Sequence, residues 1–179
     1  MTKKTLTLIS IILVAAICRL FPHAPNFTPL AAIALFSGAY ISNRLLAIAM
    51  PIVAMLLSDA LMGFNGWVFT EQVVTVYATY TLIALAAFAL RNNKSAIRVG
   101  LGSLSASIFF FITTNFATWM GGYFHSPALY PMNGFGLTEC FTAAIPFFQN
   151  TLAGDLFYSS VLFGAFYLAQ INIPALSRD

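Results

Sequence analysis

Six apolar segments divide the chain, and they constrain its fold more than any other feature. They lie at about residues 6–21, 29–41, 45–64, 73–90, 99–120 and 151–171. A helix needs roughly 17–25 mostly apolar residues to cross the ~30 Å hydrocarbon core of a bilayer. The first two segments are short by this standard, and they cross only if the residues between them fold into the protein at membrane depth. The pattern predicts an all-α membrane protein with one domain over residues 1–179, a compact bundle of six transmembrane helices.

The composition also favours a membrane location. Of the 179 residues, 60% are hydrophobic and only 7% are charged, and the mean hydropathy is +0.86. A soluble domain carries about 25% charged residues, so we expect the excess apolar surface to face the lipid bilayer. The chain has no phosphate-binding glycine loop, so it is not expected to hydrolyse a nucleotide by itself. The positive net charge fits asymmetric membrane loops, and we expect no nucleic-acid partner.

The basic residues predict how the bundle is oriented. Six spans place both termini on the same side of the membrane. Most basic residues fall on that side: Lys3, Lys4, Arg44, Arg91, Lys94, Arg98 and Arg178. Because positively charged loops stay on the inner side of a membrane, both termini are predicted to be cytoplasmic.

Two connections on the outer side stand out. Residues 19–29 hold three prolines, which fix φ and remove backbone donors, so this first outer loop is predicted to be stiff and non-helical. Non-helical backbone is tolerated at membrane depth only inside the protein or along a cavity, so we expect the loop to form the wall of a small-molecule site. The fifth loop, residues 121–150, is long and aromatic. Within it, residues 136–145 are predicted to form a short interfacial helix that ends at Pro146. An aromatic belt at the headgroups is the simplest explanation of the rings.

Four polar side chains fall at a similar depth below the predicted outer face. At 1.5 Å per helical residue, Arg19 lies ~3 Å inside its segment, Asp155 ~6 Å, and Asp59 and Asn115 ~7 Å. An ionisable group in a span costs about 2.5–3.5 kcal/mol even on lenient insertion scales, so such groups usually face the bundle interior and mark a functional site. These residues predict an outward-facing pocket for a polar solute. A structural alternative is that Arg19 pairs with Asp59 or Asp155 and only clamps the helices.

The predicted substrate site combines these polar groups with aromatic walls, as ligand pockets commonly do. Trp and Tyr rings also stack on planar heterocycles, which favours a ring-containing solute. The predicted substrate-binding residues are Arg19, His23, Asn26, Asp59, Trp67, Asn115, Trp119, Tyr123, Asn150, Asp155 and Tyr158.

No catalytic residue, metal site or cofactor is predicted. His23 and His125 do not have the spacing of metal ligands. Ser58 and Asp59 have no visible base or oxyanion partner, so a serine hydrolase is not expected. Ser103 and Ser107 form a small-x-x-x-small pair, which predicts close helix packing.

Several motifs resemble a family of uncharacterised bacterial six-helix membrane proteins. They are Pro25-Asn26-Phe27-Thr28-Pro29, Ser58-Asp59 with Gly63, Thr114-Asn115 with Trp119, and Pro146-Phe147-Phe148 with Asn150 and Gly154-Asp155. The architecture of six short helices with an outer pocket also resembles the S components of energy-coupling factor transporters. The resemblance implies a multi-pass protein of the bacterial inner (plasma) membrane that captures a vitamin, a cofactor precursor or a metal ion. Its implied partners are a transmembrane coupling protein and two ATPase subunits.

Other functions remain open at this stage. S components often carry an Ala-x-x-x-Ala face on the first helix, whereas this chain has Ala15-Ala16 there. One alternative is therefore that the protein acts alone as a facilitator or serves another membrane assembly. A second alternative is an intramembrane enzyme that uses Asp59 or Asp155 as an acid or base on a lipid-like substrate. Another is an assembly or scaffold protein whose buried charges fix helix register.

Overall fold

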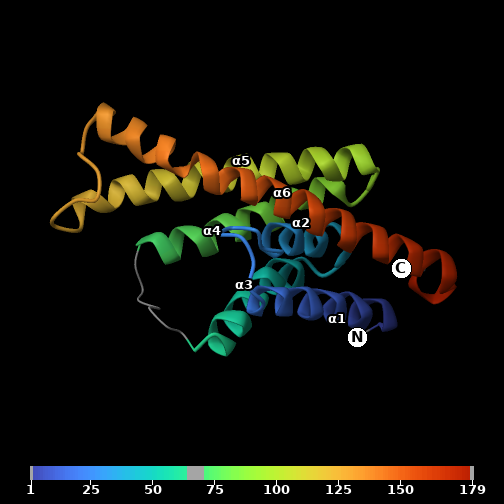
Figure 1. The fold of residues 1–179 in the computed structure, drawn as a ribbon. Helices are drawn as coiled ribbons and strands as arrows, with labels where there is room; N and C mark the ends of the chain where they lie inside the picture. Colours follow the sequence, from blue (N-terminus) through green and yellow to red (C-terminus); the bar gives the residue numbers. More distant parts are fainter. Residues whose placement is uncertain (1, 64–70, 178–179) are drawn as a thin grey trace.

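The computed structural model describes residues 2–63 and 71–177 (Figure 1). Within these residues all regular secondary structure is helical. The helices are α1 (Lys3–Ile17), α2 (Leu30–Tyr40), α3 (Arg44–Leu61), α4 (Glu71–Ala86), α5 (Ala96–Met120) and α6 (Gly134–Asn172). Short 3-10 turns extend or follow four of them: η1 (Cys18–Leu20), η2 (Ala87–Leu90), η3 (Gly121–Tyr123) and η4 (Pro174–Leu176). The predicted all-α fold is confirmed.

Within residues 2–63 and 71–177, four helical stretches are long and apolar enough to cross a membrane. They are Arg44–Leu61, Glu71–Leu90, Ala96–Tyr123 and Gly134–Asn172. These stretches contain the third to sixth apolar segments of the sequence, apart from residues 62–64 at the end of the third. The first two segments give the shorter helices α1 and α2, with 15 and 11 residues.

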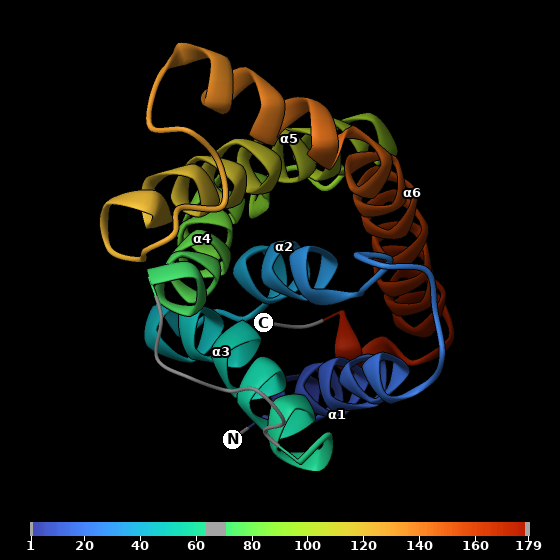
Figure 2. The same ribbon diagram turned by 60° about the vertical axis from the view of Figure 1, so that its left-hand side comes forward.

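The short helix α2 lies at the centre of the bundle, with the other five helices around it (Figure 2). Its ten residues from Leu30 to Ala39 are all buried. At 1.5 Å per residue its 11 residues span about 16 Å, which is far less than a bilayer core. The apolar sequence of α2 is therefore explained by burial among protein side chains.

Arg91 anchors the C-terminal end of this central helix. Its guanidinium donates to the carbonyl oxygens of Gly38 at 3.0 Å, Ile41 at 2.8 Å and Ser42 at 3.4 Å. The last carbonyl groups of a helix have no partner within the helix, so a cation there satisfies them and complements the helix dipole. Gly38 also permits a close approach to α4, because a Cβ at this position would lie 2.3 Å from the Ala84 carbonyl oxygen.

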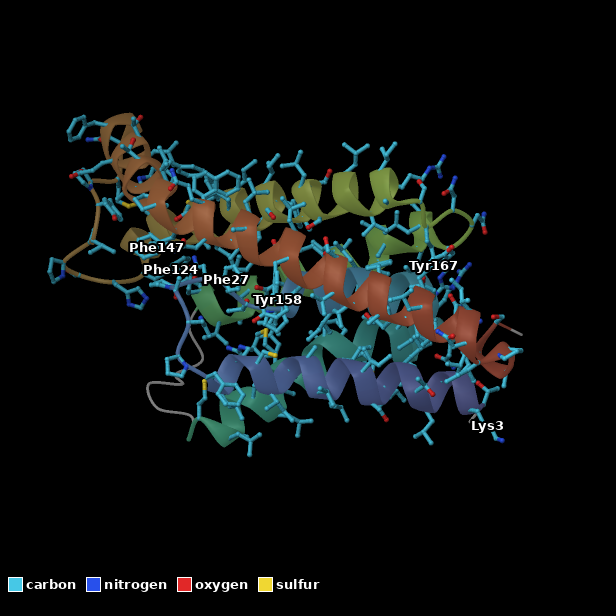
Figure 3. The ribbon with its side chains drawn as sticks, turned by 45° about the vertical axis from the view of Figure 1, so that its right-hand side comes forward. Lys3, Phe27, Phe124, Phe147, Tyr158 and Tyr167 are labelled. Atoms are coloured by element: carbon cyan, nitrogen blue, oxygen red, sulfur yellow. The ribbon has the colours of Figure 1, made fainter. Side chains whose placement is uncertain are left out.

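The two ends of the bundle differ. Both termini lie at one end, here called the terminal end, together with Lys3 and Tyr167 (Figures 1 and 3). Phe27, Phe124 and Phe147 lie toward the opposite end, here called the distal end (Figure 3). The distal end corresponds to the outer side in the sequence prediction.

Residues 136–145 are helical, but the predicted end of this helix at Pro146 is wrong. α6 runs for 39 residues with Pro146 inside it, so the connection before α6 is limited to residues 124–133 and the fifth loop is much shorter than predicted. Proline removes one helical hydrogen bond and typically kinks a helix. α6 accordingly changes direction along its length (Figure 2).

The segment between η1 and α2, residues 21–29, is here called the connector, and it is non-helical, as predicted. Asn26 has a φ of 65°, a left-handed conformation that asparagine tolerates, and it turns the chain toward α2. Phe27 then packs on α6, with its ring 5.8 Å from that of Phe157 and 5.6 Å from that of Tyr158. Gly154 makes this contact close, because a Cβ there would lie 3.1 Å from the Phe27 Cα. The connector is therefore fixed against α6 at the distal end.

Candidate functional site

The four polar residues predicted at one depth fall into three groups. Arg19 and Asp59 form an ion pair, with Nη1 at 2.8 Å from Oδ1. Arg19 also hydrogen-bonds to the Ser58 hydroxyl, and the Tyr77 hydroxyl donates to Asp59 Oδ2 at 3.2 Å. This pairing was the structural alternative in the sequence analysis. It links η1, α3 and α4 at the distal half of the bundle.

Asp155 forms the second group. Its side chain is buried in the interface between α5 and α6, where the residue is 3% exposed. The Ser107 hydroxyl donates to Asp155 Oδ2 at 2.7 Å. Among the described residues no basic side chain forms an ion pair with Asp155. Asp155 is therefore separate from the Arg19–Asp59 pair.

Asn115 belongs to the third group, a cavity at the distal end. The cavity has a volume of about 230 Å³ and lies between the connector, α4, α5 and α6. Its polar lining consists of amide and hydroxyl side chains: Asn26, Gln72, Thr114, Asn115 and Thr151. Its apolar lining is mostly aromatic: Val76, Phe110, Phe111, Ala144, Phe147 and Phe148. None of these described lining residues carries a charge.

Three amide groups in this lining have unused hydrogen-bonding capacity. Asn115 donates Nδ2 to the Phe111 carbonyl at 2.7 Å, which leaves its side-chain oxygen without a partner among the described residues. Gln72 accepts from Thr118 at 3.1 Å through Oε1, which leaves its side-chain nitrogen without one. The Asn26 amide makes no side-chain hydrogen bond within the described chain. The cavity thus offers both a donor and acceptors beside phenyl rings.

The other predicted site residues lie away from this cavity. His23 is exposed and contacts the Ala24 carbonyl at 2.9 Å. Trp119 donates from its indole nitrogen to the Pro131 carbonyl at 3.1 Å. The ring of the exposed Tyr123 lies 6.3 Å from the Trp119 ring, measured between centroids. Asn150 is half-buried on α6 outside the lining.

Tyr158 and Trp67 are two further predicted substrate-binding residues. Tyr158 packs on Phe27 and interacts with the Cys18 thiol, so it supports the connector. Trp67 lies outside the described residues. Of the predicted substrate-binding residues, the structure therefore brings Asn26 and Asn115 together at one cavity.

The sequence analysis missed Gln72, Thr114 and Thr151 as lining residues. Thr114 and Thr151 also hydrogen-bond to the carbonyls of Phe110 and Phe147 on their own helices, so they are compatible with an apolar segment and give no strong sequence signal. Gln72 was the more visible one, because it is an uncharged polar residue at the start of an apolar helix.

Comparison with known families places the whole bundle in one family. The model of DUF6580, a family of unknown function, matches residues 1–176. The chain belongs to DUF6580. No curated protein and no solved structure matches it. Because the match covers every helix, the DUF6580 unit includes the connector, α4, α5 and α6 that surround the distal cavity.

The position of the carboxylates bears on what a DUF6580 site of this geometry can do. Asp59 is paired with Arg19 and Asp155 is bonded to Ser107, and neither lines the distal cavity. The described lining therefore offers no acid or base to a bound molecule. Its chemistry suits binding through neutral hydrogen bonds and ring contacts.

Proposed function

We propose that this DUF6580 chain is an integral membrane subunit that binds a small solute for uptake, similar in role to an S component of an energy-coupling factor transporter. In this proposal the chain crosses the bilayer six times, and the connector folds into the protein at membrane depth to complete the short second crossing through α2. Both termini are in the cytoplasm and the distal end faces outward. A transmembrane coupling protein with two ATPase subunits would be its partner. Four helices of sufficient length and apolarity support the membrane location.

The distal cavity is the observation that carries the proposal. It combines unused amide donors and acceptors with aromatic walls, which is the usual composition of small-molecule pockets. Its volume of about 230 Å³ is below that of typical drug-sized pockets of roughly 300–1,000 Å³, so the solute is small. Because no described lining residue is charged, the solute is uncharged where it contacts the cavity, since a buried unpaired charge is costly. A planar nitrogen heterocycle of a vitamin or a cofactor precursor fits these requirements.

A co-purification experiment tests this function. Wild-type protein is extracted in detergent, and small molecules released on denaturation are identified by mass spectrometry. In parallel, nicotinamide, uracil and adenine serve as probes in a thermal-shift assay, because each is a planar heterocycle with donors and acceptors. We expect a co-purifying heterocycle or a rise in melting temperature with at least one probe.

Two matched variants localise the binding. Asn115 and Asn172 both donate their amide to the backbone carbonyl four residues earlier on their helix, but Asn172 lies at the terminal end. Asn115→Ala is expected to lose the bound molecule or the thermal shift by tenfold or more, whereas Asn172→Ala keeps it. Equal profiles for the two variants, or no bound molecule and no shift with the wild type, would overturn the proposal.

A further inference from the structure

A seam of buried polar side chains joins α5 to α6. Ser103 and Ser107 face it from α5, and Thr151, Asp155 and Ser159 face it from α6; all five are buried. Residues four apart lie on the same side of a helix, so each set forms a row along its helix. Ser107 donates to Asp155 at 2.7 Å, and the hydroxyls of Ser159 and Ser103 are 3.4 Å apart. The small-x-x-x-small pair predicted for packing is part of this seam.

The seam ends at a cavity in each direction. Thr151 lines the distal cavity, one helical turn before Asp155. Ser159 lines a second cavity of about 700 Å³ one turn after it, between α5 and α6 on the side of the terminal end. Lys94 and Tyr167 contribute to this second cavity. Asp155 thus lies between two cavities, one turn from a lining residue of each.

Asp155 is the one acidic side chain among the described residues of this seam. Tyr80 of α4 is the titratable group that faces it, and Tyr80 in turn interacts with Arg19 and with the Thr28 side chain. From α5 the facing group is the Ser107 hydroxyl, and from α6 the nearest titratable neighbour in the chain is Tyr158. Burying a carboxyl group in a helical bundle without a basic partner costs stability, so such groups usually mark a functional site.

The Ser107 hydroxyl is placed to accommodate both protonation states of this carboxyl group. Its oxygen lies 2.7 Å from Asp155 Oδ2 and 3.1 Å from the Ser103 carbonyl oxygen. When Asp155 is ionised, Ser107 donates its proton to Oδ2. When Oδ2 carries a proton, Oδ2–H donates to the Ser107 oxygen and the Ser107 proton turns to the Ser103 carbonyl. The hydrogen bond therefore survives a proton transfer without movement of either helix.

We propose that Asp155 is a proton-binding site reached from both cavities through the hydroxyl seam. One proton enters from the water of one cavity onto Asp155 Oδ2 and leaves to the water of the other. The proposal rests on the proposed function for the membrane location alone. The proton site itself can be tested without any solute, so the two proposals fail separately.

The test uses dicyclohexylcarbodiimide, an apolar reagent that adds to protonated carboxyl groups. The full chain in proteoliposomes is treated over a series of pH values, and modification of Asp155 is read by peptide mass spectrometry. We expect Asp155 to be labelled in acidic solution and labelling to fall at least tenfold as the solution becomes alkaline. With a pH gradient across the vesicle, acidifying either compartment is expected to raise the labelling, because the seam reaches both cavities.

Three variants separate a proton site from a structural contact. Asp155→Asn keeps an oxygen that accepts from Ser107, so it is expected to fold and to lose the label. Ser107→Ala is expected to shift the pH profile of labelling, whereas Ser160→Ala, whose hydroxyl bonds to the Leu156 carbonyl, leaves it unchanged. Labelling of Asp155 that ignores pH, that responds to one compartment alone, or that is absent at every pH would overturn the proposal.

Discussion

Arg19 Nη1 lies 2.8 Å from Asp59 Oδ1, and this ion pair ties the end of the first helix to α3. The two side chains are 16% and 12% exposed, so the pair is largely removed from solvent. Tyr77 adds α4 to the same contact through its hydrogen bond to Asp59. Removing one partner of a buried ion pair strongly destabilises a protein, because the other charge is left uncompensated.

Removing one partner of this pair should destabilise the bundle. We expect Arg19→Gln to lower the free energy of unfolding by about 2–4 kcal/mol, and the double variant with Asp59→Asn to lose less than the sum of the single variants. Thermal unfolding in detergent measures both effects. Arg98→Gln is the control, since the exposed Arg98 side chain makes no ion pair among the described residues. Additive losses in the double variant would contradict a direct coupling.

Gly154 should be sensitive to any added side chain. A Cβ at Gly154 would lie 3.1 Å from Phe27 Cα and 3.2 Å from the Thr28 nitrogen, which are both backbone atoms. We expect Gly154→Val to cost about 1–3 kcal/mol through overpacking, measured by unfolding in detergent. Gly164→Val on the same helix is the matched control, because a Cβ there would meet nothing within 4 Å. Equal losses for both would show that helix propensity, not packing of the connector, decides the effect.

The sequence predicted the helices well where length and apolar composition decide the structure. The segment predicted over residues 99–120 appears as Ala96–Met120, and the one over 73–90 appears within Glu71–Leu90. The stop at Pro146 failed because local propensity was overridden by packing. The part of α6 before Pro146 lies along α5, where the Phe141 ring is 5.5 Å from the Phe111 ring.

The candidate site was predicted less completely, for a geometrical reason. Counting residues fixes the depth of a side chain along a helix. The structural alternative drawn from it, in which Arg19 pairs with Asp59 or Asp155, holds for Asp59. Depth does not fix rotation about the helix axis. Asp155 therefore faces Ser107 inside the α5–α6 seam, while Asn115 faces the distal cavity.

Arg91 should be needed for its shape as well as its charge. Its guanidinium contacts three carbonyl oxygens at the end of α2, which a lysine ammonium at the same position cannot reproduce. We expect Arg91→Lys to lower the free energy of unfolding by about 1–3 kcal/mol, because buried carbonyl groups lose their donors. Unfolding in detergent is again the measurement. Arg98→Lys is the control, and an equal effect of the two substitutions would argue against the capping role.

Pro146 should control solute binding through the shape of α6. The distal cavity is lined by Ala144 before the proline and by Phe147, Phe148 and Thr151 after it, so the direction of both parts of α6 sets the cavity. Pro146→Ala restores a backbone donor and favours a straighter helix. We therefore expect equal or higher thermal stability together with a severalfold loss of the co-purifying molecule or of the probe-induced thermal shift. Pro174→Ala, in the turn η4 after α6, is the control and should retain binding. Full binding by Pro146→Ala would show that the bend is not required for the cavity.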